Sequence, residues 1–301
     1  MISFKQVKHV KQVNGKRLRE AGMIRKCSDK DYHVLMRYLQ QEPVYHTFII
    51  ADITRYGFDK DYQTVYMQEA KEGCCGIFLR YYNNFIVAGD AGAIDYREAG
   101  SLVTGGITTV MGRAELVSRI CSGLDRDYEY GQKVLYTYEG KAGTANPIEE
   151  PTEESTEESP TEELPTEEPP AVRPAGLDDV DRIYDFLMGI PQLRPLYTQK
   201  AMIENRIRSG EGIHVIMEKD GKIIAHGNSA ASADLTVMLG GIGVSPEYRR
   251  KGYASRIMEG LCREIQKGKR TPCIFAGDEA SKALCEKAGF VEYGSWGTAQ
   301  F

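Results

Sequence analysis

The chain has 301 residues, of which 42% are hydrophobic, so it has room for two domains with apolar cores. Its net charge of −5 is unevenly spread, because residues 146–171 carry ten Glu and no Lys or Arg, whereas residues 1–22 carry six basic residues and one Glu. The rest of the chain is neutral, so its charge does not predict nucleic acid as a general partner, which would need a basic face or stripe.

Cysteine usage and hydropathy narrow the class of protein further. The 7 cysteines are scattered, odd in number and without a C-x-x-C pair, so the sequence predicts no zinc or other metal site and fits a reducing cytoplasm. No apolar run reaches the length of about 18 residues that a membrane span requires, so we expect no membrane partner.

Residues 1–22 are basic and lack the apolar core of a secretory signal. Ser28-Asp29-Lys30-Asp31 then has the composition of a helix start. We therefore expect Met23 to be the natural initiator and residues 1–22 to be an upstream extension. A basic arm for an acidic partner and a short structured extension are the alternatives.

Residues 23–145 have the pattern of a mixed α/β lobe. Apolar residues at helical spacing predict helices, and short apolar or alternating runs between turn residues predict strands. The expected helices are 32–39, 44–53 and 114–124, and the expected strands are 76–80, 84–88, 108–111 and 133–138.

Residues 146–171 form a separate acidic segment. The unit T-E-E recurs at Thr152, Thr156, Thr161 and Thr166, with prolines between the repeats. Such a segment has almost nothing apolar to bury and its like charges repel, so we predict a disordered, extended linker. A partner-binding acidic tail is the alternative interpretation.

Residues 172–301 predict a second mixed α/β lobe, with an Asp-Gly hairpin turn at 220–221. The expected strands are 172–175, 213–218, 222–226, 235–244, 272–276 and 291–299, and the expected helices are 177–187, 201–208, 254–266 and 279–288. About ten residues follow the last helix, which is enough for one long strand. A further strand is therefore either missing or supplied by the other lobe.

The clearest chemical signal is the stretch L-G-G-I-G-V-S-P-E-Y-R-R-K-G-Y-A-S-R-I-M-E at 239–259. An apolar strand ends at Val244, a basic turn follows at 249–252, and a helix with one apolar face begins at Tyr253. A helix N-terminus presents unpaired N–H groups and a partial positive charge, and Gly252 lets the backbone approach a ligand. This combination predicts an anion site suited to a pyrophosphate.

Two motifs carry a family resemblance. Arg249-x-x-Gly252-x-Ala254 after V-x-P resembles the acyl-CoA signature of the GNAT superfamily of N-acetyltransferases. The segment A-L-C-E-K-A-G-F at 283–290 resembles the second hallmark of this family, a helix that ends in a Gly-Phe turn. Residues 172–301 resemble a GNAT domain from end to end, and residues 23–145 are similar in layout to the degenerate N-terminal lobe of tandem GNAT proteins.

The resemblance implies an α/β (α+β) fold, with a mixed, mostly antiparallel sheet flanked by helices in two lobes. The N-terminal lobe lacks the signature turn, so we expect it to bind no acyl-CoA and to be structural or to shape the substrate cleft.

The resemblance also implies where acetyl-CoA binds. The pantetheine arm is expected on the backbone of Ile242, Gly243 and Val244, where neighbouring glycines favour a distorted strand. The residues expected to hold the pyrophosphate are Arg249, Arg250, Lys251, Gly252, Tyr253, Ala254 and Ser255. A backbone N–H near Val244 is the expected donor to the thioester oxygen, an interaction worth ~3 kcal/mol.

The groups that transfer protons are less clearly encoded. Cys285 stands where many GNAT relatives have the Tyr that serves as general acid, and it either donates a proton or simply packs. Tyr293 and Ser295 are further candidates for the acid. Asp234 and His226 are candidates for the general base. Alternatively, Asp234 is simply a turn residue and His226 a hydrogen-bonded residue of the sheet.

The sequence therefore predicts a cytoplasmic, metal-free N-acetyltransferase, either monomer or homodimer. It is expected to transfer an acetyl group from acetyl-CoA to a primary amine of a small molecule, amino acid or peptide, by direct attack in a ternary complex. The alternative is an acyl-CoA-binding regulatory module, a pseudoenzyme with little catalysis. A third hypothesis, a nucleic-acid binder that uses residues 1–22, predicts salt-dependent binding that is lost when they are deleted.

Overall fold

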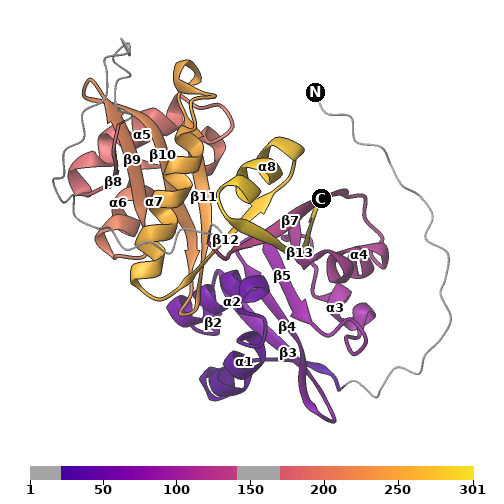
Figure 1. The fold of residues 1–301 in the computed structure, drawn as a ribbon. Coiled ribbons are helices and arrows are strands. Elements are labelled where there is room, and N and C mark those ends of the chain that lie inside the picture. Colours follow the sequence, from indigo (N-terminus) through magenta and orange to yellow (C-terminus); the bar gives the residue numbers. More distant parts are fainter. Residues whose placement is uncertain (1–21, 141–169) are drawn as a thin grey trace, which may run out of the picture.

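A continuous sheet of thirteen strands runs through the molecule, with helices on both faces (Figure 1). The computed structural model describes residues 22–140, which form the N-terminal lobe, and residues 170–301, which form the C-terminal lobe. Apart from Gly22, Pro170 and Ala171, the predicted extension and linker lie outside the described residues. The predicted mixed, mostly antiparallel sheet in two lobes is confirmed.

The N-terminal lobe follows the predicted order of elements, with additions. Its helices are η1 (Asp29–Asp31), α1 (Tyr32–Leu39), α2 (Pro43–Tyr56), α3 (Tyr96–Ser101) and α4 (Ala114–Ser122). Its strands are β1 (Ile24–Lys26), β2 (Asp59–Lys60), β3 (Gln63–Ala70), β4 (Gly73–Tyr81), β5 (Asn84–Gly89), β6 (Thr109–Arg113) and β7 (Glu129–Tyr138). Strand β3 and helix α3 are the longer of the elements that were not predicted from the sequence.

The C-terminal lobe contains every element that the sequence predicted for it. Its strands are β8 (Val172–Pro174), β9 (His214–Lys219), β10 (Lys222–Ser232), β11 (Thr236–Val244), β12 (Thr271–Ala276) and β13 (Phe290–Gln300). Its helices are η2 (Leu177–Asp179), α5 (Val180–Met188), η3 (Arg194–Leu196), α6 (Lys200–Arg208), η4 (Pro246–Tyr248), α7 (Tyr253–Lys267) and α8 (Glu279–Lys287). No helix in the described parts of the chain is long and apolar enough to cross a membrane.

The two lobes exchange their last strands. The strand order is β1-β3-β4-β5-β6-β13-β7-β12-β11-β10-β9-β8, so β7 lies between β13 and β12, and β13 lies between β6 and β7. Strand β13 pairs with β6 from Trp296↔Arg113 to Gln300↔Thr109. The N-terminal lobe therefore supplies the strand that the C-terminal lobe lacks, which was one of the two outcomes expected from the sequence.

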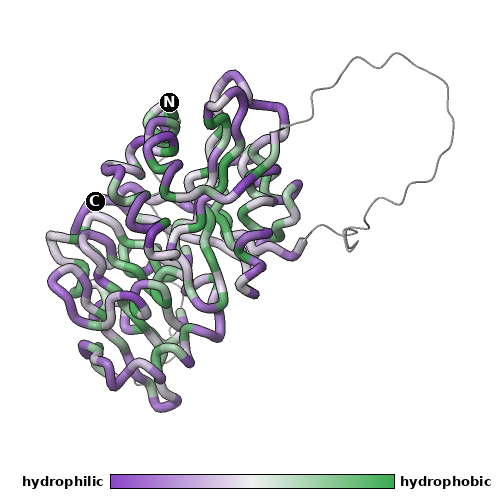
Figure 2. The backbone as a smooth tube through the Cα atoms, turned by 90° about the vertical axis from the view of Figure 1, so that its left-hand side faces the viewer, coloured by the Kyte–Doolittle hydropathy of each residue, from purple (hydrophilic) through white to green (hydrophobic). Residues whose placement is uncertain are grey.

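Alternation along the central strands divides the core between the two faces of the sheet. Leu135, Met238 and Cys273 face the cluster that contains α1 and α2. Their neighbours Tyr136, Leu239 and Ile274 face the cluster that contains α7 and α8, as expected where successive side chains point to opposite faces. Hydrophobic segments accordingly gather in the interior of both lobes, and polar segments lie at the outer turns (Figure 2).

Helix α2 of the N-terminal lobe packs against the C-terminal lobe. The hydroxyl groups of Thr47 and Thr236 are hydrogen-bonded at 2.8 Å, and Arg55 forms an ion pair with Glu211. Asp52 lies in the same interface, where burial and the nearby Glu211 carboxylate raise its pKa to about 7.

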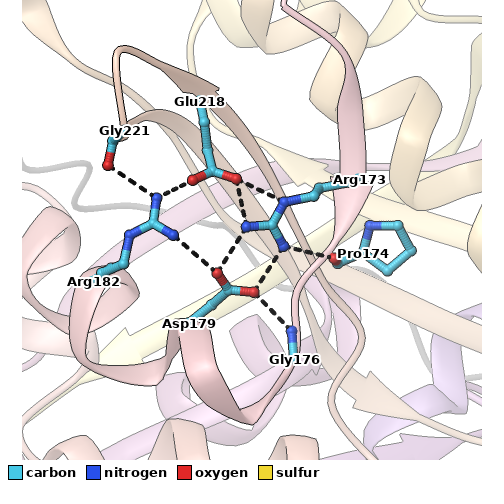
Figure 3. Close-up of polar contacts among 7 residues, drawn as sticks. All are labelled: Arg173, Pro174, Gly176, Asp179, Arg182, Glu218 and Gly221. Carbon is cyan, nitrogen blue, oxygen red and sulfur yellow. Dashed lines mark hydrogen bonds and ion pairs between the residues drawn. The ribbon is translucent and has the colours of Figure 1, made fainter.

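The most extensive charged cluster of the C-terminal lobe is electrically balanced (Figure 3). Asp179 accepts hydrogen bonds from both terminal nitrogens of Arg173 at 2.8 Å, and Glu218 pairs with Arg173 and Arg182. The Arg173 guanidinium lowers the pKa of Asp179 to about 2. This network ties β8 and α5 to the β9–β10 hairpin, so we assign it to the stability of this edge.

Candidate active site

The sheet opens between β11 and β12. These parallel strands are in register only from Thr236↔Thr271 to Met238↔Cys273, although β11 continues to Val244 and β12 to Ala276. Within the described residues, no strand pairs with the β12-facing edge of β11 beyond Met238. Backbone groups along this edge are therefore available to an extended ligand.

The predicted distortion of β11 is confirmed as a bulge. The pairing with β10 shifts register between His226↔Gly243 and Asn228↔Gly240. Gly241 occupies the bulge with φ +55°, in the left-handed region that favours glycine. The bulge lies where the sheet opens.

A buried pair of histidines, His214 and His226, is hydrogen-bonded to the bulge. His226 is fully buried, and its Nδ1 donates to the carbonyl oxygen of Gly241 at 3.1 Å, because a carbonyl can only accept. Its Nε2 then accepts from Nδ1 of His214 at 3.0 Å. Burial lowers the pKa of His226 to about 4, so it is neutral near pH 7. His226 is thus a hydrogen-bonded sheet residue, the second of its two predicted roles.

Tyr197 also lies against the bulge. Its hydroxyl donates to Oδ1 of Asn228 at 2.6 Å, and both atoms lie so close to Gly241 that a Cβ there would overlap them. Burial raises the pKa of Tyr197 to about 12, which keeps the phenol protonated at neutral pH. Tyr197 was not identified from the sequence, because only the fold brings the segment after η3 to β11.

The basic turn and the start of α7 border a cavity of about 310 Å³, which we name the turn cavity. Arg250 (φ +63°) and Gly252 (φ +80°) are both left-handed, which bends the chain sharply before α7. No side chain of the described residues caps the N-terminus of α7, whereas Asp278 caps α8. The first N–H groups of α7 are therefore left for a ligand or solvent.

Seven of the ten predicted cofactor residues line the turn cavity. Its lining consists of Val244, Tyr248, Arg249, Arg250, Gly252, Tyr253, Ala254, Ser255, Leu284 and Lys287. Of the other three, Ile242 packs in the α7 cluster, Gly243 lies against the side chains of Ile190 and Leu193, and Lys251 lies over the Tyr248 ring at 5.4 Å. Tyr248, Leu284 and Lys287 were not predicted; the place of the last two beside the turn depends on how α8 packs.

The structure places the three candidate proton-transfer residues far from one another. Cys285 is 2% exposed in the α7–α8 core, and burial raises its pKa to about 11. Tyr293 on β13 packs against Tyr45, and β12 and β7 separate its strand from β11. Asp234 lies in the exposed turn before β11, roughly 30 Å along that strand from Val244.

The arrangement of potential metal ligands was also compared with the prediction of no metal site. Within residues 22–140 and 170–301, no three His, Cys, Asp or Glu side chains are grouped so that they could hold a metal ion.

Part of the C-terminal lobe matches a known protein family. Residues 178–290 match the family described as "Acetyltransferase (GNAT) family". No curated protein sequence matches the chain.

Solved structures of other proteins resemble this chain along most of its length. The GCN5-related N-acetyltransferase-like protein from Streptococcus suis 89/1591 has a TM-score of 0.54 and 12% identity, covering 91% of this chain and 99% of that one. A tandem GNAT protein from the clavulanic acid biosynthesis pathway has a TM-score of 0.55 and 9% identity, with 94% and 98% covered. A GCN5-related N-acetyltransferase from Sphaerobacter thermophilus has a TM-score of 0.53 and 15% identity, with 93% and 95% covered.

At these identities the structural likeness shows a shared fold across both lobes, and the family match covers the lobe that contains the opened sheet and the turn cavity. Residues 178–290 therefore match the GNAT acetyltransferase family, and both lobes share the fold of these solved structures.

Proposed function

We propose that the protein transfers an acetyl group from acetyl-CoA to a primary amine of a small molecule, amino acid or peptide, by direct attack in a ternary complex. The opening of the sheet between β11 and β12, next to an uncapped and basic helix start, carries this proposal. It combines an extended edge for a pantetheine arm with an anion site for a pyrophosphate.

The cofactor is held in two sections. The pyrophosphate binds the first N–H groups of α7 and the cationic side chains of Arg249 and Arg250, and Lys287 adds charge from α8. Arg249 donates from Nε to the Val244 carbonyl at 3.2 Å, which fixes the guanidinium at the end of β11. The pantetheine arm then runs along the free edge of β11 towards the bulge.

The bulge stabilises the transition state. When the amine attacks, the thioester carbonyl oxygen gains negative charge, and a backbone N–H of β11 near Val244 donates to it. One such fixed donor contributes ~3 kcal/mol, provided that it does not reorient during the reaction. His226 bonds the Gly241 carbonyl, and the Tyr197 hydroxyl lies against the Gly241 Cα, so we assign His226 a positioning role for this donor.

We assign proton donation to Tyr197 rather than to Cys285. The Tyr197 hydroxyl lies at the bulge and, with its pKa raised to about 12, remains a donor at neutral pH. The Cys285 thiol lies in the apolar core between α7 and α8, away from the bulge. During the reaction the Tyr197 O–H turns from Asn228 Oδ1 to the departing thiolate of CoA or the tetrahedral oxyanion, and the proton that the amine loses passes to solvent.

Calorimetric binding of acetyl-CoA tests where the cofactor binds. We expect one site on the wild-type chain, weakened at least about 100-fold in an Arg249→Glu, Gly252→Asp double variant, because a charge is reversed and a carboxylate is placed against the phosphates. The matched control is Arg263→Glu with Gly221→Asp, which makes the same charge change at an exposed position of α7 and at a left-handed glycine of a distant hairpin.

Equal weakening in both double variants would contradict the assigned site, and two sites would show that the N-terminal lobe also binds the cofactor. Catalysis is tested separately, by release of free thiol from acetyl-CoA with a panel of primary amines. If no amine raises release above hydrolysis, the transferase proposal fails.

A further inference from the structure

Two buried polar atoms beside the histidine pair have no hydrogen-bond partner within residues 22–140 and 170–301. They are Nε2 of His214 and Nε of Arg206. His214 is 3% exposed, and the Arg206 guanidinium is fixed by its terminal nitrogens, which donate to the carbonyl oxygens of Ala230 at 3.0 Å and Ser229 at 2.8 Å. Because buried polar groups bond either to protein or to ordered water, these two atoms indicate a bound partner.

The hydrogen bonds of the pair determine which ring nitrogens carry protons. The Gly241 carbonyl oxygen can only accept, so His226 donates from Nδ1 and its Nε2 is a lone pair. This lone pair accepts from Nδ1 of His214 at 3.0 Å. Burial lowers the pKa of His214 to about 2, and the neighbouring His226 and Arg206 add to this effect, so both rings are neutral near pH 7. Nε2 of His214 is therefore an acceptor without a donor, and Nε of Arg206 is a donor without an acceptor.

The two atoms lie close together, next to Gly212. A Cβ built on Gly212 would be 3.3 Å from Nε2 of His214 and 3.1 Å from Nε of Arg206. The same Cβ would be only 2.7 Å from Cβ of Arg206, so a side chain at this position would crowd the site. Since neither nitrogen bonds the other among the described groups, a water molecule is the smallest ligand that satisfies both: it accepts from Arg206 and donates to His214.

With this water, a chain of hydrogen bonds runs in one direction to the bulge. Arg206 donates to the water, the water to His214, His214 to His226, and His226 to the carbonyl oxygen of Gly241. The chain begins at a guanidinium charge and ends on one peptide group. Hydrogen bonds in such a chain polarise one another and strengthen each bond by about 10–30%.

The peptide group at the end of the chain also contains the N–H of Ile242. All peptide bonds of the described residues are trans, so this N–H points away from the Gly241 carbonyl. The N–H of Ser245 donates to the Ile224 carbonyl of β10 at 2.9 Å, and Gly243 pairs with β10 as well. Because backbone groups alternate between the two edges of a strand, the N–H of Ile242 points to the edge that faces β12, where the sheet opens.

We propose that one water molecule bridges Arg206 and His214, and that the chain from Arg206 to Gly241 makes the N–H of Ile242 the donor to the charged thioester oxygen. A hydrogen bond to the C=O of a peptide group enlarges its dipole and strengthens its N–H as a donor. Arg206 and His214 are positioning residues, since they act through His226 and this peptide group. The role of the chain rests on the proposed acetyltransfer, whereas the water site does not.

A crystal structure of the whole chain without ligand tests the water site. We expect one ordered water within hydrogen-bond distance of Arg206 Nε and His214 Nε2. NMR of the histidine ring nitrogens at neutral pH should show both rings protonated at Nδ1 and unprotonated at Nε2. A dry site, a direct bond between Arg206 and His214, or a proton on Nε2 of His214 would overturn the proposal.

The infrared stretch of the thioester carbonyl tests the role of the chain. With acetyl-CoA that is isotope-labelled at this carbonyl, a weaker N–H donor raises the stretching frequency of the bound thioester. We expect a rise in His214→Leu, which removes both ring nitrogens, and a smaller rise in His214→Asn, whose amide can still donate to His226. One fixed donor contributes about 100- to 1,000-fold to kcat, so a bond weakened by about 10–30% should lower kcat about two- to eightfold, with KM for acetyl-CoA changed less than about twofold.

The matched control is His46→Leu. His46 is 5% exposed and its Nδ1 also donates to a backbone carbonyl, that of Leu39 at 2.8 Å, but it lies on α2 against Tyr38 of the N-terminal lobe. This variant should change neither the frequency nor kcat, and cooperative thermal unfolding shows that each variant folds. An equal frequency shift in the control, or bound acetyl-CoA with no shift in His214→Leu, would refute the role of the chain. Absence of acetyl-CoA binding to the wild type would instead refute the proposed function, while the water would still be seen in the crystal.

Discussion

Gly241 in the candidate active site is constrained both by its backbone conformation and by the side chains beside it. Its φ of +55° makes any L side chain there strained, and an added Cβ would also overlap the Tyr197 hydroxyl and Asn228 Oδ1. Gly210 is a matched reference: its φ is +72°, and no described heavy atom lies within 4 Å of the position of its Cβ. Alanine at Gly210 therefore measures the backbone strain alone.

The two substitutions should differ by the cost of the overlap. Backbone strain is ~1–2 kcal/mol at either glycine. Gly241→Ala must in addition break the Tyr197–Asn228 hydrogen bond, ~1 kcal/mol, or move the bulge, an overpacking cost of ~1–3 kcal/mol. We expect Gly241→Ala to lower the free energy of unfolding by ~2 kcal/mol more than Gly210→Ala does.

Urea unfolding followed by far-UV circular dichroism measures the loss of unfolding free energy in each variant. A double-mutant cycle then shows whether the additional loss in Gly241→Ala comes from its contact with Tyr197. In a Tyr197→Phe background the hydroxyl is gone, so Gly241→Ala should destabilise the protein by ~1 kcal/mol less than it does in the wild type. Equal costs for Gly241→Ala and Gly210→Ala would refute the reasoning, because they would show that the bulge relaxes freely and is not held by Tyr197.

Four other substitutions and truncations have definite expected outcomes. Asp52→Asn should stabilise the protein at pH 8 and not at pH 4. Because the pKa of Asp52 is raised in the folded state, ionisation of its carboxyl lowers the free energy of unfolding as the pH rises from 3.8 to about 7, by at most ~4 kcal/mol before solvent screening. Equal urea midpoints of the variant and the wild type at pH 8 would contradict this. Tyr197→Phe should lower kcat ~10–100-fold in the thiol-release assay with little change in KM for acetyl-CoA, whereas Tyr184→Phe should not. Cys285→Ala should keep kcat within about threefold but lose ~1–2 kcal/mol of stability, and a large loss of rate would restore Cys285 as the acid. Residues 170–301 expressed alone should not form a folded monomer, because β7 is missing from between β12 and β13. A fragment that is monomeric in analytical ultracentrifugation and unfolds cooperatively would contradict the strand exchange.

Sequence reasoning succeeded where a pattern is local. Helix α1 was predicted at the residues that it occupies, and the basic turn before α7 was identified from consecutive residues. Strand β3 was missed because its alternation is obscured by two buried polar residues, Gln63 and Gln68, whose partners lie elsewhere in the chain. Helix α3 has only six residues, which is too short to show a period of 3.6.

The relative positions of the proton-transfer candidates could not be predicted for a related reason. Cys285, Tyr293 and Asp234 were chosen by their places along the chain, and alternation or spacing cannot say which of several strands will lie beside β11. Tyr197 carries no motif, and its role depends on a contact with Asn228, 31 positions away.

The sequence by itself determined the strand, turn and helix that form the anion site, since strand alternation, glycine conformation and helix amphipathicity act over a few residues. Only the tertiary structure decided that the lobes exchange β7 and β13, that the sheet opens beyond Met238, and that His214 and His226 are hydrogen-bonded in series to the bulge. These features join residues as far apart as Thr109 and Gln300, and such pairings are selected by how the whole chain buries its apolar surface and satisfies its backbone hydrogen bonds.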